Sequence, residues 1–120
     1  MSAAEDARTA LAFAASNAVP GVTVQPYYGD VTKPGSGYVE RARTDYPNRF
    51  GGVVTWSVVV VLPADVTAAE QWVDANQRAL VGALADEMVV TAARYERLAL
   101  DNGTSLPALF IDGTREEETP

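Results

Sequence analysis

Arginines interleaved with aromatic rings fill the stretch from residue 27 to residue 50. Half of the chain's aromatic residues lie there, and between residues 31 and 50 there are four basic residues against two acidic ones. Guanidinium groups hold phosphates and aromatic rings stack on bases, so these residue types are compatible with a nucleic-acid surface. They are also enriched at the energetic centres of protein interfaces. A third interpretation is an edge strand protected by charge, with ordinary half-buried tyrosines.

The overall charge argues against the nucleic-acid interpretation. The chain of 120 residues carries a net charge of −7, with a pI near 4.4, so phosphates should be repelled by the molecule as a whole. We therefore favour a protein interface, and expect no specific nucleic-acid binding. The candidate interface residues are Tyr38, Glu40, Arg41, Arg43, Tyr46, Arg49 and Phe50.

Catalytic chemistry finds little support. Cysteine and histidine are both absent, which removes the thiolate nucleophile, the commonest general base and the commonest metal ligands. The aspartates are scattered without the spacing of a metal or acid–base site, and the glycines form no phosphate-binding pattern. We expect no catalytic, cofactor or metal site, and interpret residues such as Asp45 and Asp112 as a solvated surface.

Two helices should frame the elements that position the candidate interface. Ser2 with Glu5 three residues later fits a capping box, and a helix is expected from about Ser2 to Ala18. Thr67 with Glu70 repeats the pattern, which predicts a second helix over 67–87.

Strands are expected at 22–28, 38–44, 52–62 and 104–111, with 88–100 also extended. The run from Gly52 to Leu62 is the strongest and should be the central strand, with Trp56 on its apolar face. In the strand over 38–44, simple alternation places Arg41 and Arg43 on one face, and neither face is strongly apolar. Such a strand should project from the body or lie at an edge. Asn102-Gly103 predicts a hairpin turn, which also explains its apparent glycosylation sequence.

This order predicts an α+β fold of two layers, a mixed and mainly antiparallel sheet with two helices packed on one face. Residues 1–114 should form a single domain, and the charged residues 115–120 a disordered acidic tail. The longest apolar run, Val58 to Leu62, is far too short to span a bilayer, so no membrane association is expected.

The same order, read with particular residues, resembles the tail terminator proteins of long-tailed, siphovirus-like bacteriophages. The resemblance covers almost the whole chain. It rests on the alanine-rich first helix leading into Val19–Val24, the loop Tyr28–Asp30, the strand Val39–Arg43, the strand Gly52–Leu62 with Trp56, and the helix opening Asp65–Glu70.

The resemblance implies a homo-oligomeric ring, commonly a hexamer, that caps the tail tube, stops its polymerisation and offers a docking surface to the head connector. The implied partners are the chain itself, the major tail tube protein and the head-tail connector protein, with DNA passing only through the ring lumen. The implied location is the head-proximal end of the virion tail, and the host cytoplasm during assembly. Two alternatives stay open: a head-to-tail connector or neck protein, and a small α+β ligand-binding or enzymatic dimer.

Overall fold

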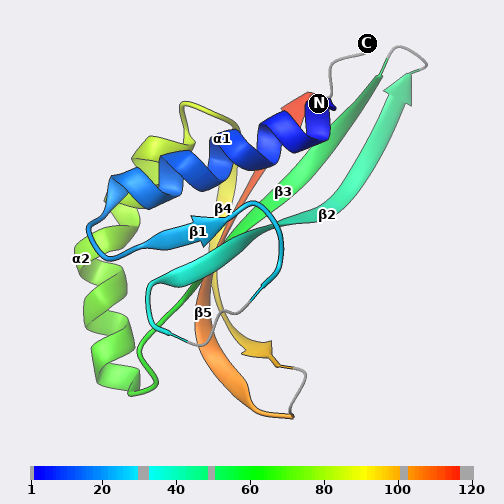
Figure 1. Cartoon of the computed structure of the whole chain (residues 1–120). Helices are drawn as coiled ribbons and strands as arrows, with labels where there is room; N and C mark the ends of the chain where they lie inside the picture. Colours follow the sequence, from blue (N-terminus) through cyan, green and yellow to red (C-terminus); the bar gives the residue numbers. More distant parts are fainter. Residues whose placement is uncertain (1, 30–32, 49–50, 101–102, 117–120) are drawn as a thin grey trace.

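A five-stranded mixed sheet carries both helices on one of its faces (Figure 1). The computed structural model describes residues 2–29, 33–48, 51–100 and 103–116. Along the chain, the elements are α1 (Ala3–Ala18), β1 (Thr23–Gln25), β2 (Ser36–Asn48), β3 (Gly51–Val61), α2 (Val66–Leu84), β4 (Val89–Ala99) and β5 (Ser105–Glu116). The predicted fold class, α+β with a two-layer arrangement, is confirmed.

The strands are ordered β1-β2-β3-β5-β4, so β3 is central as expected. β1 runs parallel to β2, and the other neighbouring pairs are antiparallel. β1 ends at Gln25 rather than near Tyr28, because Pro26 follows and has no N–H to continue a ladder.

Both helices begin at a side-chain cap. The hydroxyl oxygen of Ser2 accepts a hydrogen bond of 3.1 Å from the Glu5 N–H, as the capping-box pattern predicted. The cap predicted at Thr67 is wrong. Asp65 caps α2 instead, accepting a bond of 2.9 Å from the Ala68 N–H, and a carboxylate suits the positive end of the helix dipole.

The main core lies between β3 and the helices. Trp56 is 1% exposed, and Val54, Val58, Val60 and Leu62 lie on the same face of the sheet, in one cluster with side chains of α1 and α2. The predicted apolar face of this strand is therefore correct. On the opposite face a smaller cluster contains Tyr38, Val59, Val61, Leu98, Ala108 and Phe110.

A β-bulge in β2 overturns the predicted faces of that strand. Arg41 pairs with Trp56, yet Arg43 pairs with Thr55, the next residue of β3, so Ala42 is extra. Arg41 therefore lies on the helix-facing side and Arg43 on the opposite side. Simple alternation failed because a bulge inserts one residue and inverts the faces of every residue after it.

β2 and β3 continue as a hairpin past the N-terminal end of α1, where neither helix covers them (Figure 1). The prediction that the strand over 38–44 projects from the body is wrong for its first half, because Tyr38 and Val39 are buried in the two core clusters; the projecting part comes later in β2. β5 is also longer than expected, because Arg115 and Glu116 pair with Val54 and Val53. A disordered tail starting at residue 115 is thus wrong for these two residues, and 117–120 lie outside the described residues.

β4 and β5 form the expected antiparallel hairpin, from Ala99 opposite Ser105 to Val89 opposite Thr114. Gly103 has a φ of +85°, which suits glycine in a turn. Asp101 and Asn102 lie outside the described residues, so the predicted turn type stays a prediction.

Candidate subunit interface

Two of the predicted interface residues that the structure describes, Arg43 and Tyr46 of β2, are largely exposed. Tyr46 is 70% exposed, and the side chain of Arg43 is 72% exposed. Arg43 Nε donates a 3.0 Å hydrogen bond to Asp45 Oδ2, an ion pair on the sheet face opposite the helices. Since exposed ion pairs contribute little to stability, this pair can exchange its partner at low cost. Arg43 and Tyr46 are the predicted residues best placed to contact another molecule.

Arg41 points back toward the domain. Its guanidinium carbon lies 5.8 Å from the centre of the Trp56 ring, and its Nε donates a 3.1 Å hydrogen bond to Thr44 Oγ1. The sequence placed Arg41 and Arg43 together as equivalent interface cations. The bulge separates them, so Arg41 supports the hairpin's root while Arg43 faces outward.

Tyr38 is the clearest correction among the candidate residues. It is only 7% exposed and meets the Tyr28 ring edge-on, with the ring centres 5.0 Å apart. Burial, together with the Glu40 charge and Tyr28, raises the pKa of its hydroxyl to about 12. The loop after β1 returns across this face of the sheet and covers the ring, so Tyr38 belongs to the subunit's own core.

Glu40 is exposed on the same face, opposite Ser57 of β3. Ser57 in turn pairs with Asp112 of β5, the partner of Arg94, so Glu40 lies on the same face of the sheet as these polar residues. Arg49 and Phe50, the last two predicted interface residues, lie outside the described residues.

Arg8 was missed by the sequence reasoning. Its guanidinium lies 4.4 Å from the centre of the Tyr27 ring and 5.2 Å from that of Trp56. Its Nη1 donates to the carbonyl oxygens of Pro26 at 3.0 Å and Val39 at 2.9 Å. Arg8 thereby ties α1 to the strand from which the hairpin projects. Arg8 lies one helical turn before Leu11, next to the apolar stripe of α1, and this position could have indicated from the sequence that its side chain contacts the sheet.

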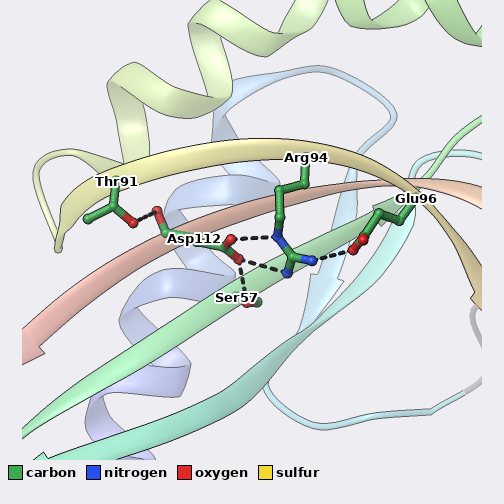
Figure 2. A network of polar contacts seen from close by, with 5 residues as sticks. All are labelled: Ser57, Thr91, Arg94, Glu96 and Asp112. Atoms are coloured by element: carbon green, nitrogen blue, oxygen red, sulfur yellow. Dashed lines mark hydrogen bonds and ion pairs between the residues drawn. The ribbon is translucent and has the colours of Figure 1, made fainter.

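A polar network lies on the sheet face opposite the helices (Figure 2). Asp112 accepts hydrogen bonds from Ser57 Oγ at 2.6 Å, from Arg94 Nε at 2.6 Å and from Arg94 Nη2 at 3.1 Å. Arg94 also forms an ion pair with Glu96, and its guanidinium stacks over the Phe110 ring at 4.8 Å. Three adjacent strands are joined through one carboxylate.

The sequence predicted that Asp112 is a freely solvated carboxylate. The hydrogen bonds from Ser57 and Arg94 show that this prediction is wrong. Burial alone would raise its pKa, but the hydrogen bonds from Arg94 and Ser57, with the Arg94 charge, lower it below the ordinary aspartate value. The prediction failed because the strand was expected to end at Ile111. The extension of β5 brings Asp112 opposite Ser57.

The hydrogen bonds of this network hold Asp112 in its ionised form and link β3, β5 and β4. Every partner of Asp112 is a hydrogen-bond donor that favours the ionised form, whereas a general acid or base works with a pKa near the operating pH. Within the described ranges, no group of three or more acidic side chains is arranged to hold a metal ion. In the same ranges, neither helix has the length and apolar character needed to cross a bilayer.

Neither models of known protein families nor curated protein sequences give a match to this chain.

Proposed function

We propose that this chain is a structural subunit of a phage virion, a tail terminator that assembles into a ring on the end of the tail tube. The ring stops further polymerisation of the tube and offers a docking surface to the head connector. The resemblance of the element order and of the quoted motifs is the source of this specific identity. The proposal places the protein at the head-proximal end of the tail, and in the host cytoplasm before assembly.

One observation supports a role in subunit assembly above all others. The β2–β3 hairpin extends beyond both helices (Figure 1). Tyr46 is exposed in its outer part, and Arg43 is exposed farther back, where it pairs with Thr55. Arginine and tyrosine are the residue types that most often anchor protein interfaces. A hairpin held by β-pairing alone at its outer end gains order when a neighbouring molecule packs against it.

The charge distribution fits contacts between identical subunits. Away from the hairpin the chain is strongly acidic, with a net charge of −7 overall, so the exposed arginine of the hairpin faces an excess of carboxylates on any second copy. A contact between two different surfaces of identical subunits propagates from one subunit to the next, and closes when the rotation between subunits fits a ring.

The proposal is tested by assembly and by tail capping. Light scattering of the purified protein, with negative-stain imaging, should reveal a closed ring, and added rings should bind one end of purified tail tubes and stop their growth. Rings that bind the head connector but never a tube end would identify a connector instead. A protein that stays a monomer or dimer, and leaves tube growth unchanged, would refute the assignment.

A variant of the β2–β3 hairpin tests whether this segment takes part in ring formation. Arg43→Glu should weaken ring formation while leaving the circular dichroism melting curve unchanged, because an exposed substitution alters stability by only about 0.5 kcal/mol. Lys33→Glu is the control, since Lys33 is an exposed basic residue before β2 that lies outside the projecting part of the hairpin.

A further inference from the structure

A groove of about 440 Å³ lies between the N-terminal part of α2 and the β4–β5 hairpin. This part of α2 is far from the end of the β2–β3 hairpin (Figure 1). Its floor is apolar and includes Leu62, Ala69, Val73 and Ala108, all of them buried. Val66, which is 70% exposed, and Tyr95 add apolar surface at its mouth. Large exposed apolar side chains beside a recess are typical of a surface that another molecule covers.

The α2 wall of this groove is acidic. Glu70 and Asp74 stand four residues apart on one side of the helix, and both line the groove. Neither carboxylate has an ion-pair partner among the described residues. On the opposite wall, Arg97 is turned toward β5, where it donates hydrogen bonds to the hydroxyl and the carbonyl oxygen of Ser105. The groove thus combines an apolar floor with two unneutralised negative charges on one wall.

We propose that this groove receives the end of the β2–β3 hairpin of a second copy of the chain. The inference rests on the proposed ring and names the two surfaces that build it. Arg43 of the incoming hairpin meets Glu70 and Asp74, and Tyr46 covers the apolar floor beside Tyr95.

The faces of the hairpin suit the two walls. The bulge at Ala42 puts Arg43 on one side of β2, while Tyr46 lies on the other side, close to Gly52. A hairpin entering between α2 and the β4–β5 hairpin can therefore present its arginine to the acidic helix and its tyrosine to the apolar floor beside Tyr95. A volume of about 440 Å³ accommodates one or two large side chains rather than a whole strand. This matches the anchor-in-pocket arrangement of interface hot spots.

The geometry makes the contact intermolecular. The molecule measures 46 × 31 × 23 Å, and the hairpin end lies far from the N-terminal part of α2, whose residues line the groove (Figure 1). A subunit cannot place its hairpin in its own groove. Each copy then offers one hairpin and one groove, and such a contact between unlike surfaces forms rings or filaments rather than closed two-fold dimers.

Charge exchange tests the contact without relying on tail tubes. The double variant Glu70→Arg with Asp74→Arg should weaken self-association by roughly tenfold to a hundredfold, because charged pairs at an interface repel once one partner is reversed. Adding Arg43→Glu to the same chain should restore the oligomer mass seen by light scattering. Reversing Asp86, an exposed acidic residue just after the end of α2, is the control, since Asp86 does not line the groove.

Cross-linking supplies a second measurement that does not depend on charge. The chain has no cysteine, so Tyr46→Cys and Val66→Cys can be made in separate samples, mixed and oxidised. We expect a disulfide-linked heterodimer, and expect none above background when Phe13→Cys, also on an exposed position, replaces Val66→Cys.

Unchanged oligomer mass in the groove variant, no rescue by Arg43→Glu, or equal cross-linking to residue 13 would each overturn the inference. A monomeric wild-type chain at high concentration would do so as well, leaving the groove to a different partner. If oligomers follow the charge exchange but never cap tubes, the hairpin-in-groove contact stands and the terminator function fails. If the variants still form rings and these rings cap tubes, the terminator function stands and the hairpin-in-groove contact fails.

Discussion

The guanidinium carbon of Arg8 lies over the ring of Trp56, 5.2 Å from its centre, where α1 crosses the root of the β2–β3 hairpin. Arg8 also donates to the carbonyl oxygens of Pro26 and Val39, so one side chain joins the helix, the loop after β1 and β2. The projecting part of the hairpin is thereby fixed at its base by a charge held against an aromatic plane.

Trp56→Ala should destabilise the protein by about 3 to 5 kcal/mol, because the substitution empties a buried site and removes the ring on which Arg8 rests. The measurement is the urea midpoint of unfolding followed by circular dichroism. Phe13→Ala serves as a control, since Phe13 is 71% exposed and its loss should leave the midpoint nearly unchanged. A near-native midpoint for Trp56→Ala would contradict the packing of the central strand.

Asp112→Asn should lower stability at neutral pH by about 1 to 3 kcal/mol, because Arg94 and Ser57 lose a charged acceptor. The folded-state pKa of Asp112 lies below the ordinary value near 3.9, so the ionised form contributes stability above about pH 4. That contribution is lost as the pH falls through the folded-state pKa.

The difference in unfolding free energy between Asp112→Asn and the wild type should therefore be largest near pH 7 and shrink toward pH 2. Urea titrations at several pH values measure it. Glu96→Gln is the control, since Glu96 is an exposed partner of Arg94 and should change little. A difference that stays constant with pH would show that Asp112 is not ionised in the folded protein.

Gly37→Ala should destabilise the protein by about 1 to 3 kcal/mol. A Cβ at residue 37 would lie 1.9 Å from the Val59 carbonyl oxygen, so β2 and β3 would have to separate. Gly82→Ala makes a matched comparison, because a Cβ there meets nothing within 4 Å and the site is helical. That variant should gain roughly 0.5 to 1 kcal/mol in unfolding free energy. Equal melting temperatures for the two variants would be incompatible with this close strand contact.

Truncation after Thr114 should lower the thermal midpoint, whereas truncation after Glu116 should not. The longer deletion removes the pairing of Arg115 and Glu116 with β3, together with the hydrogen bond of 3.3 Å from Arg115 Nη1 to the Glu87 carbonyl oxygen. The sequence alone predicted that both deletions are harmless. Identical thermal midpoints for the two shortened chains would show that Arg115 and Glu116 do not stabilise the fold.

Much of the architecture was predictable from local patterns. The start and end of α1, the central position of β3 and the apolar face around Trp56 follow from capping residues, from a run of β-branched residues and from alternation. The projection of the hairpin was foreseen only in part, because Val39 and Tyr38 of the same strand are buried on opposite faces of the sheet.

The candidate interface was predicted less well. Arg43 and Tyr46 are exposed, as a residue that contacts another molecule must be, whereas Tyr38 is buried and Arg41 turns toward Trp56. Composition identifies a segment that differs from its surroundings, but whether a given side chain in it faces outward depends on the partner strand.

The sequence by itself determined the class of fold and the exclusion of thiol and imidazole chemistry, since those depend on residue types and on contacts between near neighbours in the chain. Only the tertiary structure decided which residues meet across strands. The bulge at Ala42, the covering of Tyr38 by Tyr28 and the link from Arg94 to Asp112 each depend on register between distant segments. A shift of one residue inverts the face of every side chain that follows, and packing of the whole sheet selects among registers that local propensity leaves almost equal.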